Sequence, residues 1–243
     1  RHIFEHSITV RDISSKFIYH KCDNSLQSVK KELEKNNFDV LGAEKDGIFG
    51  YVVRTELEKQ KSLGTIRQFQ PNHLISETTP LIDLFPILKV RERVFVLTKN
   101  KIDRIVTRFD LQKAPVRMLI FGFISILEMH LLRIIKGLYP AGSWQKLLKY
   151  NRILKAKELY SERKARNEEL DLVDYIQFAD KRDLLLENME VLRKVGFKSK
   201  KSYKTFFKKV EDLRNKLAHS QELVEGSSWP DIIDLTINVE KLI

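Results

Sequence analysis

The feature that most constrains the fold is an internal repeat in the first half of the 243-residue chain. Alternating apolar residues predict strands at 38–43 and 48–53, joined by the turn residues Asp46-Gly47. The same pattern returns about 54 residues later, with predicted strands at 93–97 and 102–106. Asp-Gly between apolar runs is a strong hairpin signal, and Lys99-Asn100-Lys101 is the corresponding turn of the second copy, so each copy is expected to contain a β-hairpin.

Helical patterns flank both hairpins. Helices are predicted before them, at 25–33 and 79–88. The segments that end the hairpins, 50–57 and 104–111, align with each other and lead into a short helix in each copy. Each copy is therefore a strand-helix-strand-strand-helix (βαββα) unit, and the repeat predicts an α+β domain in the first half of the chain.

This repeat resembles a tandem pair of CBS domains, named after cystathionine beta-synthase. The resemblance covers most of residues 8–113, and the domain is expected to span residues 1–113. In that family two modules pack sheet to sheet, and the clefts between them commonly bind adenine nucleotides. Thr107 and Asp110 match the family's contact pattern, a Ser or Thr followed three residues later by an Asp. The resemblance implies that Asp110 accepts protons from ribose hydroxyls and that Thr107 and Arg108 contact phosphates. ATP, ADP or AMP would then be a regulatory ligand.

The first copy departs from this pattern. Val53 stands at the hydroxyl position and Glu56 at the Asp position, so one cleft is expected to have lost its ligand contacts. Asp110 also has a purely structural alternative, since Asp is a favoured helix-capping residue. The sequence leaves both roles of Asp110 open.

The strand patterns end at residues 112–115, and a domain boundary is expected there. Pro115 suits the first turn of a new helix, and residues 115–243 are predicted to form an all-α helical bundle. The five predicted helices cover residues 115–136, 144–166, 170–195, 202–219 and 229–242.

The fourth predicted helix ends in the stretch Leu213-Arg214-Asn215-Lys216-Leu217-Ala218-His219. This stretch resembles the signature of the HEPN family (higher eukaryotes and prokaryotes nucleotide-binding). These domains are all-helical and carry an Arg, commonly followed by a polar residue such as Asn, a few residues before a His. The spacing alone is not specific, because Arg1 and His6 show it as well. Arg214 and His219 therefore keep an alternative as ordinary surface residues.

The residue types of this motif suit the cleavage of RNA without a metal or cofactor. A His can exchange a proton near neutral pH, and an Arg can hold a phosphate and stabilise its growing negative charge. Asn215 would orient either group or the phosphate. The nucleophile is the 2′-hydroxyl of RNA itself, and the HEPN resemblance implies products with a 2′,3′-cyclic phosphate and a 5′-hydroxyl.

One helix does not complete such a site. A five-residue step turns roughly 140° around a helix, so Arg214 and His219 are not stacked on one face. HEPN domains usually dimerise, which implies a composite site at a homodimer interface. Glu128, His130 and Asp180 are further polar candidates, and for each of them a role in the core or at an interface is favoured.

Charge and composition restrict the partners. The net charge is +11, and residues 193–216 contain ten basic residues against Glu211 and Asp212. Such clustering favours a polyanion such as RNA, with a solvated helix face as the alternative. The single cysteine, Cys22, excludes an intramolecular disulfide and suggests a reducing, cytoplasmic compartment. The longest apolar run, 119–127, falls short of the roughly 20 residues that span a bilayer, so no membrane partner is expected.

The sequence thus favours a metal-independent endoribonuclease, a hydrolase whose HEPN site is regulated by an adenine nucleotide bound to the CBS pair. Stress response or defence against phage is the setting that the resemblance implies. The alternative is a non-catalytic HEPN module that binds RNA or a protein under the control of the CBS pair. A third possibility is an interaction scaffold without a ligand.

Overall fold

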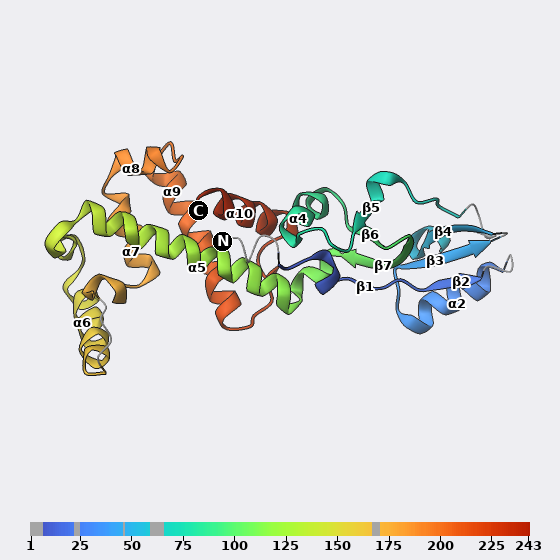
Figure 1. Cartoon of the computed structure of the whole chain (residues 1–243), viewed down its shortest axis with the longest axis horizontal. Helices are drawn as coiled ribbons and strands as arrows, with labels where there is room; N and C mark the ends of the chain where they lie inside the picture. Colours follow the sequence, from blue (N-terminus) through green and yellow to red (C-terminus); the bar gives the residue numbers. More distant parts are fainter. Residues whose placement is uncertain (1–6, 22–24, 46, 59–65, 167–170) are drawn as a thin grey trace. The chain divides into compact units, whose positions relative to one another are not determined.

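The computed structural model describes residues 7–21, 25–45, 47–58, 66–166 and 171–243 (Figure 1). The chain divides into two compact units, one ending at Val116 and the other running from Arg117 to Ile243. The first unit holds both β-sheets, and the second is helical.

Some predictions fall on residues that the structure does not describe. The surroundings of Cys22, the turn position Asp46 and the Arg1/His6 pair all lie outside the described residues.

The first copy of the repeat has the predicted order of elements. These are β2 (Tyr19–Lys21), α2 (Leu26–Asn36), β3 (Val40–Lys45), β4 (Ile48–Val53) and α3 (Arg54–Leu57). They form a three-stranded sheet in the order β2-β3-β4, in which β2 is parallel to β3 and β3 is antiparallel to β4. The predicted helix and hairpin are confirmed, with ends that shift by a few residues.

The second copy repeats this connectivity. Its elements are β5 (Leu74–Ser76), α4 (Leu81–Val90), β6 (Arg93–Thr98), β7 (Lys101–Thr107) and the 3₁₀ turn η3 (Arg108–Gln112). Strand β5 is parallel to β6, and β6 is antiparallel to β7. Near the N-terminus, the 3₁₀ turn η1 (Val10–Asp12) precedes β1 (Ser15–Lys16), which pairs with the free edge of β7.

The short helix expected at Asp110 is only this 3₁₀ turn. The backbone is extended at Lys113, and α5 starts one residue later with Pro115 in its first turn. Proline is well tolerated there because that N–H has no partner within the helix. The 3₁₀ turn η3 and the long helix α5 are therefore separated by the single extended residue Lys113.

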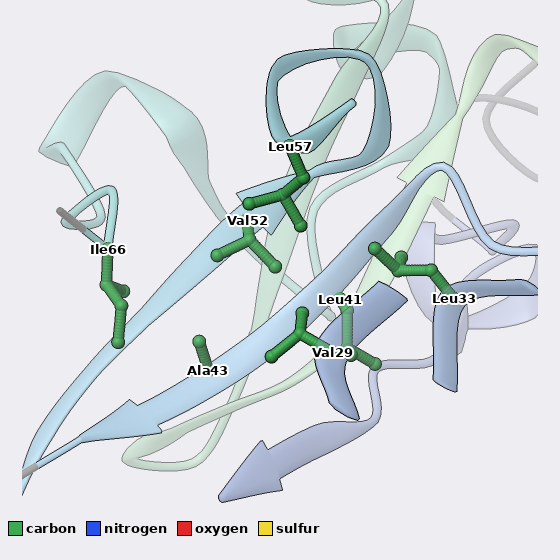
Figure 2. Close-up of a cluster of buried hydrophobic side chains, with 7 residues drawn as sticks. All are labelled: Val29, Leu33, Leu41, Ala43, Val52, Leu57 and Ile66. Carbon is green, nitrogen blue, oxygen red and sulfur yellow. The ribbon is translucent and has the colours of Figure 1, made fainter. Parts of the chain in front are cut away.

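The first copy encloses a hydrophobic core, which Figure 2 shows. Val29 and Leu33 are four residues apart on α2 and point at the sheet, as helical periodicity requires. Leu41 and Ala43 alternate along β3, so that both face α2. Val52, Leu57 and Ile66 complete the cluster.

A second cluster joins the two sheets. Tyr51 of β4 and Phe95 of β6 lie 4.7 Å apart between ring centroids, and Phe17 lies 5.1 Å from Phe95. At its border the Tyr19 hydroxyl donates a 2.8 Å hydrogen bond to the carbonyl oxygen of Ile102. Burial, with a smaller contribution from the nearby Asp103, raises the pKa of Tyr19 to about 12.

The helical unit is built around α5 (Ala114–Leu138), whose first residues group with the N-terminal unit. The elements that follow are η4 (Pro140–Leu147), α6 (Tyr150–Lys164), η5 (Leu172–Tyr175), α7 (Phe178–Leu186), α8 (Met189–Lys194), α9 (Lys200–Ala218) and α10 (Trp229–Lys241). The predicted helices at 115–136, 202–219 and 229–242 are confirmed.

The other two helix predictions were wrong in extent. The helix expected to start at Trp144 begins at Tyr150, because Ala141 and Gly142 have positive φ and Lys149 is extended. The helix expected at 170–195 is broken into η5, α7 and α8. One break comes where the Asn188 side chain accepts the Val191 N–H and starts α8.

One face of α5 forms the core of the helical unit. Its buried apolar side chains within this unit are Leu119, Ile120, Phe123, Ile124, Leu127, Leu131 and Ile135. Leu127 and Leu131 share an internal space with Leu185 of α7, Leu192 of α8 and Phe207 of α9. Among the described residues, α5 alone is long and apolar enough to cross a membrane. A core helix can have the same length and composition, so this property does not decide between the two roles.

The raised pKa of Tyr19 predicts a stability change at alkaline pH. In the unfolded chain the phenol loses its proton near pH 10, whereas in the folded unit it does so near pH 12. The contribution of Tyr19 to the free energy of unfolding is therefore complete below pH 10 and is lost as the pH rises from 10 to 12. Urea unfolding in this range should show a shallower decline for Tyr19→Phe than for the wild type. Equal declines would contradict the assignment.

Candidate functional site

The predicted motif lies at the C-terminal end of α9. The buried residues of α9 recur at the spacing of one helix face and are Tyr203, Phe207, Val210, Leu213 and Leu217. After the helix, Ser220 adopts a left-handed conformation (φ 54°). The N–H groups of Ser220 and Gln221 donate to the carbonyl oxygens of Leu217 and Lys216. This is the Schellman arrangement of a helix end, and it makes His219 the capping residue.

A stripe of exposed side chains runs along the opposite face of α9. Its members recur every three or four residues and are Lys201, Lys204, Lys208, Asp212, Asn215 and His219. We call this set the α9 stripe. Two of the three predicted catalytic residues thus lie on one exposed face that begins with lysines.

Arg214 lies away from this stripe. Its Nε is 3.5 Å from Oε2 of Glu128 on α5, and 36% of its side chain is exposed. The other oxygen of Glu128 accepts a 2.7 Å hydrogen bond from Lys181 on α7. Since α9 continues as a regular helix through Arg214 to Ala218, Arg214 and His219 stay roughly 140° apart around it. One chain therefore does not bring all three predicted catalytic residues onto one face.

Two cations that the sequence did not single out hold the end of α9. Arg117 of α5 donates to the carbonyl oxygens of Gln221 (2.9 Å) and Lys216 (3.1 Å). The Lys216 ammonium donates to the carbonyl oxygens of Leu223 and Glu225 in the following loop. Cations are favourable at a helix C-terminus. No local sequence pattern, however, indicates that the distant Arg117 is the residue that contacts the end of α9.

A groove separates α9 from α10. One cleft of about 570 Å³ is lined by Asn215, Lys216, Glu225 and Asp231 among others, and a second of about 590 Å³ adjoins it at Lys209 and Asp231. Hydrogen bonds from Ser228, with a smaller contribution from nearby Lys209, lower the pKa of Asp231. Because both signs of charge line the groove, it does not resemble a phosphate channel.

The other polar candidates have structural partners. Asp180 is 4% exposed, and its carboxylate accepts the Gln177 N–H at the start of α7. His130 is half-buried and lines the internal space beside Leu131 and Tyr203. Glu128 is the candidate that contacts the motif.

In the N-terminal unit, Thr107 and Asp110 contact each other. Asp110 is 6% exposed, and its Oδ2 accepts hydrogen bonds from the backbone N–H (2.7 Å) and hydroxyl (3.0 Å) of Thr107. Its Oδ1 faces the Lys113 ammonium at 2.7 Å and the Ser15 hydroxyl at 3.4 Å. The capping role is therefore present, and a ribose would have to displace Lys113 or Ser15.

Arg108 closes the end of α4. It donates to the carbonyl oxygens of Leu88 and Lys89, each at 2.8 Å. Arg54, its counterpart in the first copy, donates in the same way to the carbonyl oxygen of Leu33 at the end of α2. A shared structural contact therefore accounts for this arginine in both copies, and the predicted contact of Arg108 with phosphate remains a prediction.

A second pair with the Thr107/Asp110 spacing went unnoticed in the sequence. Thr9 and Asp12 form the same capping box, in which Asp12 Oδ2 accepts the Thr9 N–H at 2.7 Å. The pattern is visible at residues 9–12, but it does not separate a ligand contact from a helix cap.

Comparison with known proteins gave structural matches alone. No family model matches the chain, and no curated protein matches it. Hypoxic Response Protein I, solved with two coordinated zinc ions, is 14% identical with a TM-score of 0.34, over 42% of this chain and 95% of that one. A conserved CBS-domain protein of unknown function from Thermoplasma acidophilum is 16% identical with a TM-score of 0.36, over 46% of this chain and 73% of that one. Both are CBS-domain proteins, but at such scores neither carries an argument about function.

In the part of the chain that the structure describes, no three His, Cys, Asp or Glu side chains are gathered for a metal ion.

The contacts of Arg117 give a testable prediction. Arg117→Ala removes two charge-assisted hydrogen bonds to the end of α9 and should lower the free energy of unfolding by about 1–2 kcal/mol. Amide exchange at Ser220 and Gln221, whose N–H groups close the helix, should become faster. Arg133→Ala, on an exposed position of the same helix, is the control. Equal effects of the two substitutions would show that Arg117 does not hold the helix end.

Proposed function

We propose that the helical unit is a HEPN-like domain that binds RNA through the α9 stripe and cleaves it, as a homodimer and without a metal. In this proposal the N-terminal unit is a CBS pair that binds an adenine nucleotide and regulates cleavage. The protein would act in the cytoplasm, in stress response or defence.

The observation that carries this proposal is the electropositive surface leading to the motif. Eight basic residues between α8 and the middle of α9 are exposed: Arg193, Lys194, Lys198, Lys200, Lys201, Lys204, Lys208 and Lys209. Three of them, Lys201, Lys204 and Lys208, belong to the α9 stripe, which continues through Asn215 to His219. Clustered Lys and Arg side chains gain affinity for a phosphate backbone by releasing its counterions. An RNA strand bound along this surface would reach His219.

The separation of Arg214 from His219 supports a composite site. A second copy would have to supply the missing partner, and α5 offers a surface for it. Met118, Phe121 and Met129 are exposed by 63%, 41% and 68%, although they lie on the most apolar helix of the unit. Exposed apolar side chains gathered on one face often mark an interface. We place the homodimer contact on this face of α5.

One observation favours the alternative, a HEPN-like module that binds RNA without cleaving it. Arg214 forms an ion pair with Glu128, and a carboxylate beside the arginine reduces the attraction of the arginine for phosphate. The two functions agree on RNA binding and differ in the fate of the RNA.

Incubation of the purified protein with RNA in a chelating buffer separates these functions. Wild type should give products with 5′-hydroxyl and 2′,3′-cyclic phosphate ends. His219→Ala should abolish cleavage and keep RNA affinity, whereas Lys204→Glu with Lys208→Glu should lower affinity. Gln221→Ala, two residues beyond His219, is the matched control and should cleave like wild type. RNA that is bound but uncut by wild type, with and without adenine nucleotides, would establish the non-catalytic function.

The nucleotide site is tested by calorimetry with ATP, ADP and AMP. Asp110→Asn and Asp12→Asn each weaken a capping box of the same geometry, so Asp12→Asn controls for the loss of the box, while Asp110→Asn also weakens the pair with Lys113. If a ribose uses Asp110, only Asp110→Asn should lose affinity, by about tenfold or more for the loss of a charge-assisted bond. No heat with the wild type, or equal affinities of the two variants, would exclude this site.

A further inference from the structure

Lys181 and Glu128 form an ion pair in the interior of the helical unit. Their side chains are 6% and 21% exposed, and Nζ of Lys181 lies 2.7 Å from Oε1 of Glu128. Replacing a buried ion pair with apolar residues is often neutral or stabilising, because removing charges from water is costly. Stability alone therefore gives little reason to find this pair inside the unit.

The pair has a second contact that gives it a different role. Glu128 uses one carboxylate oxygen for Lys181 and presents the other to Nε of Arg214, at 3.5 Å. Lys181 lies on α7, Glu128 on α5 and Arg214 on α9, so one carboxylate ties the arginine of the motif to two other helices.

We propose that Glu128, anchored by Lys181, is a positioning residue that orients the guanidinium of Arg214 for the phosphate of bound RNA. The inference deepens the proposed function and rests on it. Arg214 is the residue that contacts the phosphate, and Glu128 acts through it.

Side-chain entropy explains why such an anchor is useful. An arginine side chain carries about 2 kcal/mol of rotamer entropy, part of which is lost when it is fixed on a ligand. A carboxylate that holds Nε in the free protein removes part of that loss in advance. The terminal nitrogens of Arg214 are then the donors assigned to the phosphate.

The charge of Lys181 completes the arrangement. Glu128 and Arg214 alone would form a neutral pair with little attraction for a phosphate. With the ammonium of Lys181 on the other oxygen, the three groups carry a net charge of +1. Lys181 thus lets Glu128 hold the arginine without cancelling the positive charge of the site.

A neighbouring ion pair supplies the matched control. Arg182, the next residue on α7, pairs with Glu211 of α9 at 2.8 Å, with side chains 14% and 27% exposed. This pair also ties α7 to α9, and its contact is with Glu211 rather than with Arg214. Glu211→Gln therefore weakens a comparable ion pair and leaves the proposed anchor in place.

The first experiment needs no RNA. The Nε–H signal of Arg214, assigned by its loss in Arg214→Lys, is followed by nuclear magnetic resonance in the full chain. Glu128→Gln keeps the shape of the side chain and should shift this signal. Lys181→Met should shift it as well, provided that a cooperative thermal unfolding transition shows the variant to be folded. Glu211→Gln should leave it in place. An unchanged signal in Glu128→Gln overturns the proposal.

The second experiment measures cleavage. Glu128→Gln should lower kcat by about 100-fold with little change in KM, because a small misplacement of a catalytic group has an effect of that size. Glu211→Gln should leave both constants near wild type. In an Arg214→Ala background, Glu128→Gln should cause no further loss, and additive losses would contradict a role that acts through Arg214.

Two further outcomes are decisive. If Glu128→Gln cleaves faster or binds RNA more tightly, Glu128 neutralises Arg214 rather than positioning it, and the proposal is wrong. If the wild type does not cleave RNA, the proposed nuclease function fails. The resonance of Arg214 then still decides whether Glu128 holds the arginine.

Discussion

The helical unit depends on the burial of one face of α5. That face provides the apolar core, and the polar residues Arg117 and Glu128 on the same helix contact the end of α9. They are eleven residues apart, close to three full turns, so both project from the same side of the helix. The packing of α5 therefore determines the placement of the motif as well as the stability of the unit. Any movement of α5 would shift Arg214 and the His219 cap together.

In the N-terminal unit, residues that recur in both copies of the repeat have roles in packing and in closing helices. The two copies share apolar positions because the strands and helices of each bury apolar side chains, and the two sheets meet at the aromatic rings around Phe95. They also share an arginine, at positions 54 and 108, because each closes the end of the preceding helix. These requirements are structural and would act on the repeat with or without a ligand.

Much of the fold was predictable because its signals are local. Apolar alternation and turn residues located both hairpins, and helical periodicity located α5, α9 and α10. The segment at 170–195 was predicted as one helix because its apolar spacing runs through the breaks, which depend on single capping residues such as Asn188. The separation of Arg214 from His219 around α9 followed from helix geometry. Their partners did not, since Glu128 and Arg117 are distant in sequence and meet α9 only through tertiary packing.

The paired arginines of the repeat have a consequence for how such a chain can change after duplication. In each copy the residue that closes the helix, Arg54 or Arg108, directly follows the residue at the hydroxyl position, Val53 or Thr107. The residue that closes the helix is thus separate from the capping-box residues Thr107 and Asp110, whose positions hold Val53 and Glu56 in the first copy. The first copy keeps the end of its helix closed without that capping box. A duplicated module built in this way can specialise one half without unfolding it.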